Sequence, residues 1–286
     1  MKYRLKSSLL LLRFLLSTRP SVLFKIIKKS REHLPKISTR VSRNGKFSGF
    51  ANDYMFQAIH TQGSMEPYFH EIVNVLVNRN DIILDIGANI GAWALANESF
   101  VDRIISVEAS PSTYLTLQDK CKDNEKITCV HTAIHNSPTG SVTFYECKTN
   151  TLSTTNKEWI TNTTSRFGNY GIQNEITVKT TTLDSLIQTY GMPELIKIDV
   201  EGGEYEALLT LTQKVPLLCF EWAAELMNVA SMCIGYLEKL GYTKFYIQTQ
   251  DSYTFRPTTW QPARKIIAHL TIKIPKRDWG MIWASY

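Results

Sequence analysis

Residues 81–91, with the sequence DIILDIGANIG, decide the fold of this chain. The first four residues, DIIL, form a short, mostly apolar and β-branched run, which is typical of a buried strand in a parallel sheet. The chain then turns through Gly87, Asn89 and Gly91, and Gly and Asn are the residues that adopt positive φ most readily. A helical segment, 92–98, follows. A strand that leads through such a turn into a helix brings backbone N–H groups close to a ligand.

Asp85 narrows the choice of ligand. A carboxylate at the end of this strand would repel a pyrophosphate, but it can pair with a cation or accept hydrogen bonds from the ammonium group of an amino acid. The pattern D-x-G-x-N-x-G therefore favours S-adenosylmethionine (SAM) over a dinucleotide. The G-x-G-x-x-G pattern of dinucleotide-binding proteins is absent, because Asn89 and Ala92 occupy the second and third glycine positions. We predict a SAM site that includes Asp85, Gly87, Asn89 and Gly91.

The rest of the chain alternates between strand-like and helix-like segments, which predicts a mostly parallel sheet wound on both faces. We expect strands at 103–107, 127–132, 195–200 and 215–220, and helices at 53–60, 66–78, 112–122, 183–190, 205–212 and 226–240. Extended segments at 142–147 and 176–181 flank a polar stretch, 148–170, which is expected to be a long surface loop of the kind that often carries function. The segments 244–248, 265–272 and 279–283 are expected to add antiparallel strands at the edge of the sheet.

The net charge of +6 is distributed unevenly along the 286 residues. Residues 1–46 contain 13 Lys/Arg and one acid, whereas the remainder contains 19 Lys/Arg and 25 acids. We therefore predict a basic leader, 1–46, and a mildly acidic catalytic domain, 47–286, that does not bind nucleic acid. The five cysteines are odd in number and show no C-x-x-C spacing, which favours a reducing compartment, the cytoplasm, over a disulfide scaffold or a zinc site.

The leader has three possible roles. Its leucine clusters alternate with basic residues, and Arg13 interrupts the longest apolar run, so it is too short to span a membrane. No small-residue cleavage site follows, which argues against a secretory signal. The segment could lie on an anionic membrane as a basic amphipathic helix, direct the protein to an organelle, or pack its leucines against the domain. The Ser-, Gly- and Lys/Arg-rich residues 38–50 predict a linker.

Acidic side chains follow several of the predicted strands. Glu108 ends the second strand, 21 residues after Gly87, where a carboxylate can accept hydrogen bonds from both ribose hydroxyls of an adenosine group. The segment 195–206, LIKIDVEGGEYE, is a hydrophobic strand that ends in Asp199, with further acids in the turn after it. The ligand crevice of an open α/β sheet lies at the carboxyl ends of its strands. We therefore expect these carboxylates at the mouth that holds the cofactor.

Five side chains are candidates for a general base. Asp199, Glu201 and Glu221 are the predicted catalytic residues, and Glu204 and His135, the latter in the segment TAIHNS, are further candidates. Glu204 is expected to cap the helix that follows the turn, at least in part. We assign no metal site; a divalent ion held by Asp199 and Glu201 is the alternative, because such an ion could acidify a hydroxyl group.

The chain resembles the FkbM-type SAM-dependent methyltransferases over residues 50 to 283. The resemblance rests on DIGANIG (85–91), VEASP (107–111), TLD (182–184), IKIDVEGGE (196–204) and the acid that follows Phe220. It implies a class I methyltransferase fold, which is a Rossmann-like, doubly wound, seven-stranded sheet with one antiparallel strand. It also implies methyl transfer from SAM, usually to an oxygen. Many members have His where this chain has Gly203, so any role of that histidine is absent here.

The expected acceptor is a small molecule, a glycan or a lipid, with a possible peripheral membrane contact through the leader. Two other functions are compatible with the predicted fold. One is a nucleotide-dependent oxidoreductase, which the missing glycines disfavour. The other is an inactive, membrane-docked binding module, which would have little use for Asp85, Glu108 and the acids after residue 198 together.

Overall fold

The computed structural model describes residues 36–40, 46–50, 73, 76–78, 81–137, 139–161, 171–249, 259–272 and 278–286. The helix predicted at 53–60 lies outside these residues. Of the helix predicted at 66–78, Val73 and Leu76 are described as helical.

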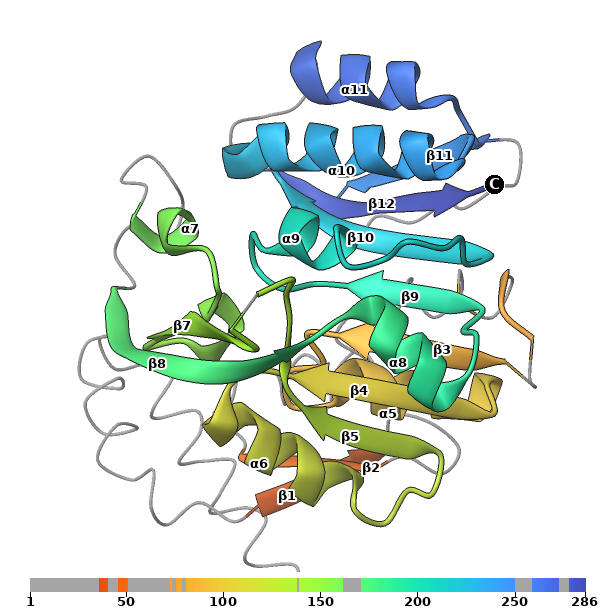
Figure 1. The fold of residues 1–286 in the computed structure, drawn as a ribbon. Coiled ribbons are helices and arrows are strands. Elements are labelled where there is room, and N and C mark those ends of the chain that lie inside the picture. Colours follow the sequence, from red (N-terminus) through yellow and green to blue (C-terminus); the bar gives the residue numbers. More distant parts are fainter. Residues whose placement is uncertain are drawn as a thin grey trace, which may run out of the picture.

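A seven-stranded sheet forms the centre of the molecule, in the order β11-β12-β10-β9-β3-β4-β5 (Figure 1). Its strands are β3 (Ile82–Ile86), β4 (Arg103–Glu108), β5 (Ile127–His131), β9 (Leu195–Ile198), β10 (Leu217–Ala223), β11 (Lys244–Thr249) and β12 (Trp279–Ser285). Strands β10, β9, β3, β4 and β5 run parallel, and β12 is antiparallel to both β10 and β11. The predicted sheet with one antiparallel strand is therefore confirmed.

The antiparallel strand lies one place in from the edge, not at the edge as predicted. Strand β11 occupies the edge and pairs with the outer side of β12. The reason is the composition of β12, in which four successive residues from Met281 to Ala284 are all buried. Such a continuous buried run is typical of an interior strand that is covered on both faces.

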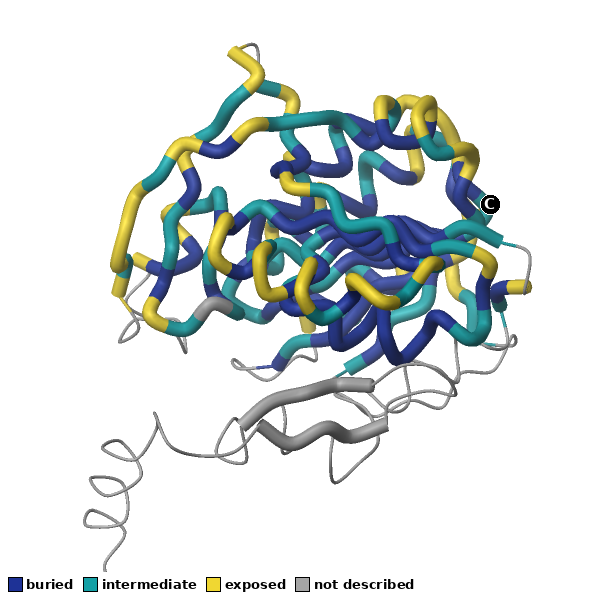
Figure 2. The backbone as a smooth tube through the Cα atoms, turned by 90° about the horizontal axis from the view of Figure 1, so that it is seen from below, coloured by how far each residue is buried: buried dark blue, intermediate teal, exposed yellow. Residues whose placement is uncertain are grey.

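Helices cover both faces of the sheet. Helices α8 (Leu183–Tyr190), α9 (Glu204–Leu208), α10 (Met227–Leu240) and α11 (Ala263–Ile272) contribute to one hydrophobic core, and η4 (Ala224–Leu226) precedes α10. Helices α5 (Ala92–Asn97) and α6 (Pro111–Cys121) contribute to the core on the other face, and η2 (Glu98–Phe100) follows α5. In β3, Leu84 belongs to the first core and Ile83 to the second, because successive side chains of a strand point to opposite faces. The buried residues run along the strands of this sheet (Figure 2).

A smaller sheet adjoins the main one, in the order β6-β8-β7. It consists of β6 (Ala133–Ile134), β7 (Ser141–Cys147) and β8 (Ile172–Thr181). The connection from β7 to β8 includes η3 (Asn150–Leu152) and α7 (Lys157–Thr161), so the prediction of a plain loop at 148–170 is wrong there. Trp159 and Ile160 are buried in a small core with Leu226, and this apolar anchor orders the segment.

Two further predictions are corrected. Residues 265–272, expected to be a strand, belong to α11; Ala263, Ile266 and Leu270 are its buried residues, and their spacing of three and four is helical. Within the expected linker 38–50, β1 (Lys36–Arg40) and β2 (Lys46–Phe50) pair as antiparallel strands. The intervening Asn-Gly sequence is a hairpin signal, which the polar composition concealed. The domain boundary after residue 46 falls within β2 and stays a prediction.

Candidate active site

A cavity of about 490 Å³ opens at the carboxyl ends of the central strands. This volume lies within the range of about 300–1,000 Å³ that is usual for small-molecule and cofactor sites. Three groups of residues line it: the ends of the strands and the turns after them, the segment around η3, and aromatic side chains from β7, α5 and β12. They are Ile86, Gly87, Ala88, Asn89, Ala92, Trp93, Val107, Glu108, Ala109, Thr132, Ala133, Ile134, Phe144, Thr151, Leu152, Ser153, Thr155, Lys197, Asp199, Val200, Glu201, Glu221 and Trp279.

The turn after β3 packs directly on the end of β9. Gly87 has a φ of +80°, and a Cβ atom there would lie 1.8 Å from the carbonyl oxygen of Asp199, so only glycine fits. Asn89 adopts a φ of 50°, as its residue type predicted. The backbone N–H groups of Gly87 and Ala88 donate to the carbonyl of Val107, so the turn is held against β4 while the close contact at Gly87 brings the β3 and β9 ends together.

Glu108 lies at the end of β4, as predicted, and faces the cavity. One carboxylate oxygen accepts a hydrogen bond from the backbone N–H of Asn89 at 3.0 Å, and the other accepts one from Ser110 at 2.8 Å. Burial raises the pKa of Glu108 to about 7, although these backbone hydrogen bonds oppose the shift. Each oxygen of a carboxylate has a second lone pair, so Glu108 can still accept two hydroxyl groups.

Asp85 and Gly91, which were also predicted to hold the cofactor, do not line the cavity. Asp85 is fully buried on β3, and its carboxylate lies 3.5 Å from the Nζ atom of Lys197. Gly91 has a φ of +82°, and a Cβ atom there would lie 2.7 Å from the Cδ1 atom of Leu117. Asp85 thus contacts a cavity residue, Lys197, without lining the cavity itself. Gly91 allows α5 to pack on α6.

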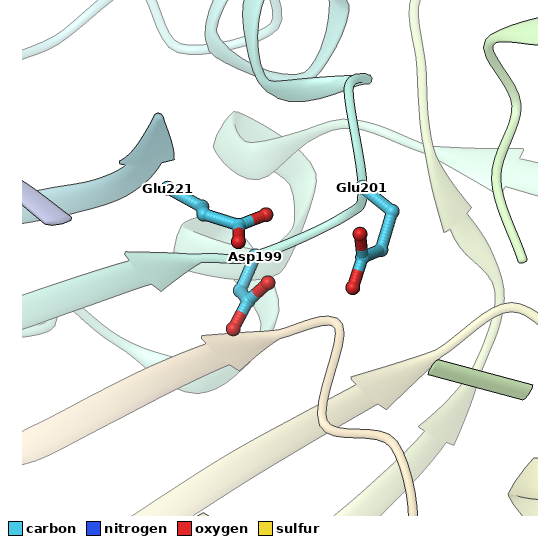
Figure 3. A group of neighbouring side chains, drawn as sticks. All are labelled: Asp199, Glu201 and Glu221. Atoms are coloured by element: carbon cyan, nitrogen blue, oxygen red, sulfur yellow. The ribbon is translucent and has the colours of Figure 1, made fainter. Parts of the chain in front are cut away.

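Asp199, Glu201 and Glu221 converge at the cavity, as predicted (Figure 3). One carboxylate oxygen from each lies within 4.8 Å of the other two. Asp199 follows β9, Glu201 stands in the next turn with a φ of 56°, and Glu221 projects from β10. Burial and the neighbouring charges of Glu201 and Asp199 raise the pKa of Glu221 well above its ordinary value. Protonation of Glu221 relieves the repulsion within this acid group.

Lys197 is a cavity residue that the sequence reasoning missed. Its Nζ atom lies 3.1 Å from Oδ2 of Asp199, and its side chain is 4% exposed. The signal was a single lysine in the otherwise apolar strand LIKI, two residues before an acid. A lysine inside a buried strand requires charged partners, because an unpaired buried charge is strongly destabilising.

His135 does not join the acid group. It is absent from the cavity lining, and its backbone N–H donates a hydrogen bond to the carbonyl of Thr181.

The segment after β7 does reach the cavity, through Thr151, Leu152, Ser153 and Thr155. The side-chain amide of Asn156 donates to the carbonyl of Gly202 at 2.9 Å. This bond ties the segment to the turn that carries Glu201.

Glu204 organises the turn from within. It is buried, and its Oε1 atom accepts hydrogen bonds from the backbone N–H groups of Val200 and Gly202, each at 3.1 Å. We expect Glu204→Ala to lower the free energy of unfolding by about 2–3 kcal/mol, because it leaves one buried and one partly buried N–H group without their acceptor. Denaturant unfolding measures this, with the exposed Glu206→Ala as the matched control. Equal stability of the two variants would contradict this role.

The same substitution should change the pH dependence of stability. Burial raises the pKa of Glu204 from 4.5 to about 7, so the folded protein holds this proton more tightly than the unfolded chain. Ionisation of Glu204 therefore lowers stability as the pH rises from about 4.5 to 7. The stability difference between wild type and Glu204→Ala should be larger near about pH 5 than near about pH 8.

The sheet order, the single antiparallel strand and the cavity at the carboxyl ends are those of a Rossmann-like class I methyltransferase. The family model of the methyltransferase FkbM domain matches residues 85–243, which is more than half of the chain. The chain therefore belongs to the FkbM methyltransferase family. It is a SAM-dependent methyltransferase, and SAM is its methyl donor.

Several solved structures are similar to this chain. A precorrin-6y C5,15-methyltransferase from Geobacter metallireducens matches with 11% identity and a TM-score of 0.42, over 77% of this chain and 89% of that chain. The methyltransferase FkbM from Methylobacillus flagellatus matches with 15% identity and a TM-score of 0.41, over 82% of this chain and 56% of that chain. An rRNA methylase from Streptococcus thermophilus matches with 8% identity and a TM-score of 0.40, over 79% and 95%.

The names of these structures refer to different acceptors, so they do not specify the acceptor of this chain. They also do not support the expected exclusion of nucleic acid. A search of curated proteins found no match.

Proposed function

We propose that this protein transfers a methyl group from SAM to a hydroxyl oxygen of a small molecule, a glycan or a lipid. The observation that carries this proposal is the convergence of three carboxylates, those of Asp199, Glu201 and Glu221, on the cavity that also contains Glu108. A hydroxyl group must lose its proton when it is methylated, and a carboxylate in the cavity can take that proton. A densely acidic cavity also disfavours the phosphates of a nucleic acid.

The cavity fits the cofactor in size and in its polar groups. Glu108 offers two carboxylate oxygens to the ribose hydroxyls, and the apolar residues Val107 and Ile134, which line the same cavity, can contact the adenine ring. Gly87 and Asn89 line the same cavity at the turn after β3, where the amino-acid part is proposed to lie. When bound, SAM supplies an electrophilic methyl group on its sulfonium.

The three acids of the cavity, Asp199, Glu201 and Glu221, have different proposed roles in methyl transfer. Asp199 removes the proton of the acceptor hydroxyl, and Glu201 accepts a hydrogen bond that orients it. The raised pKa of Glu221 favours its protonated form, which can donate a hydrogen bond to a neighbouring carboxylate. The aromatic rings of Phe144 and Trp279 and the segment 151–155 form walls that limit the access of water to this point.

Calorimetry and product analysis test this function. We expect the purified full-length protein to bind SAM and not NAD, which distinguishes it from an oxidoreductase on a similar fold. An untargeted search for methylated products in cells with and without the protein should reveal a product methylated on oxygen. A product methylated on a nucleic-acid base would contradict the proposed acceptor class.

A metal ion could assist the same reaction, because Asp199, Glu201 and Glu221 present oxygen ligands within 4.8 Å of one another. Hard divalent cations such as Mg²⁺ prefer such oxygen ligands. We expect methyl transfer to persist in EDTA, since Lys197 already supplies one cation to Asp199. Turnover is measured with EDTA and after addition of Mg²⁺. If EDTA abolished the activity and Mg²⁺ restored it, the reaction would depend on a bound metal ion, contrary to this expectation.

The leader is proposed to dock on anionic membranes. Among the residues that the structure describes, no helix has the length and apolar character to cross a membrane. Residues 1–35 carry nine Lys/Arg and one acid. Each basic residue near an anionic surface contributes about 1 kcal/mol of attraction.

Deletion of residues 1–35, which preserves β1 and β2, should abolish sedimentation with phosphatidylserine vesicles and leave SAM affinity unchanged. Neutral vesicles and high salt are the controls, since both remove the electrostatic attraction. Equal sedimentation of full-length and truncated protein would contradict membrane docking. Loss of folding on truncation would instead show that the leader packs against the domain.

A further inference from the structure

Lys197 occupies a buried position in the centre of the sheet. It is the third residue of β9, and its neighbours Ile196 and Ile198 are both fully buried. Its own side chain is 4% exposed, yet it reaches the cavity lining. A lysine so placed loses most of its hydration, and it remains charged only if opposite charges compensate for that loss.

Two carboxylates provide this compensation. Asp85 on β3 is paired in register with Lys197 on β9, so their side chains project from the same face of the sheet. The Nζ atom lies 3.5 Å from Oδ1 of Asp85 and 3.1 Å from Oδ2 of Asp199. Asp85 is fully buried, whereas the Asp199 side chain is 26% exposed. The three side chains therefore form a row that runs from the core to the cavity.

The row restricts the carboxylate of Asp199. The ion pair engages one of its oxygens, Oδ2, and the acceptor needs only the other. The ring of Trp93 lies 5.7 Å from the Nζ atom and forms another contact that restricts the lysine. The ammonium group also offsets part of the repulsion among Asp199, Glu201 and Glu221, which lie within 4.8 Å of one another.

We propose that Lys197 is a positioning residue that holds the Asp199 carboxylate toward the reacting methyl group, and that Asp85 anchors Lys197. The proposal rests on the proposed function, in which Asp199 is the base. It gives Asp85 a role that differs from the cofactor contact predicted from its motif. Asp85 acts on the reaction through Lys197 and Asp199.

The test uses binding alone, so it does not need the acceptor. Sinefungin is a SAM analogue in which a primary amine replaces the sulfonium methyl group, and S-adenosylhomocysteine lacks that group. The ratio of the two affinities therefore reports whether a carboxylate is held at the methyl position. We expect the full-length wild-type protein to bind sinefungin roughly tenfold more tightly than S-adenosylhomocysteine, because a charged hydrogen bond forms with the amine.

Lys197→Met should remove most of this preference, and Lys197→Arg should retain it because the guanidinium can still pair with both carboxylates. Lys265→Met, an exposed change on α11, is the matched control and should behave as wild type. Lys197→Met leaves Asp85 buried without its partner and can fail to fold. The double variant Asp85→Asn, Lys197→Met removes both charges, so it should fold and still lack the preference.

The outcomes separate the two proposals. If Asp199→Asn keeps the wild-type preference, Asp199 is not at the methyl position and the proposed base is wrong. If Asp199→Asn loses the preference but the Lys197 variants keep or increase it, Asp199 is the base and the positioning role of Lys197 is overturned. An increase would show that Lys197 only opposes positive charge in the cavity. Loss of the preference in Asp199→Asn, in Lys197→Met and in the double variant would support the proposal.

Discussion

Asp199→Asn should reduce the turnover number about 10²- to 10⁴-fold, the usual contribution of a general base. Asparagine has nearly the same shape as aspartate but cannot take the proton of the acceptor hydroxyl. Because Glu108 lies on a different strand, the affinity for SAM should stay within about threefold of wild type, less than 1 kcal/mol. Turnover is measured on the acceptor that corresponds to the methylated product found in cells. SAM affinity is measured by calorimetry.

Two further variants test the assignment of Asp199 as the base. Asp123→Asn, an exposed change of the same kind after α6, should leave turnover unchanged. Glu201→Gln should also lose most turnover, because the acceptor hydroxyl then loses the carboxylate that orients it. Near-normal turnover in both Asp199→Asn and Glu201→Gln would place the base elsewhere, and Glu221 is the remaining acid of the group.

Glu108→Ala should weaken SAM binding roughly 10- to 150-fold, which corresponds to about 1.5–3 kcal/mol for hydrogen bonds to a charged group. The substitution removes both oxygens that we propose to accept the ribose hydroxyls. It also removes the acceptors for the N–H groups of Asn89 and Ser110, so the turn after β3 loses support. Calorimetry measures the affinity, and circular dichroism establishes that the variant is folded.

Because the pKa of Glu108 is raised to about 7, the effect of this substitution on SAM affinity should also depend on pH. The ionised carboxylate is the stronger acceptor, so its contribution to SAM affinity should grow as the pH rises through about 7. The difference between wild type and Glu108→Ala should therefore be larger near about pH 8 than near about pH 6. The exposed Glu125→Ala serves as the matched control. Unchanged SAM affinity in a folded Glu108→Ala protein would exclude Glu108 from the cofactor site.

The local elements of the central sheet could be predicted because each depends on a short pattern. β3, β4 and β9 are apolar runs that end in an acid or in a Gly-rich turn, and these features follow from neighbouring residues alone. The errors occurred where longer-range contacts decided the outcome. Residues 265–272 carry β-branched residues but bury one helical face, and β12 lies inside the sheet because β11 pairs with its outer side.

The sequence by itself determined the alternating fold, the family motifs and the presence of acids at the ends of neighbouring strands. Strand order brings those ends to one edge of the sheet, so their convergence could be expected without coordinates. Only the tertiary structure decided which acids face the cavity. Asp85 and Asp199 both end apolar strands, but the register of β3 and β9 places Asp85 opposite Lys197 in the core, whereas Asp199 lies beyond the strand end. A side chain's depth depends on the strands beside it, and no local pattern encodes that depth.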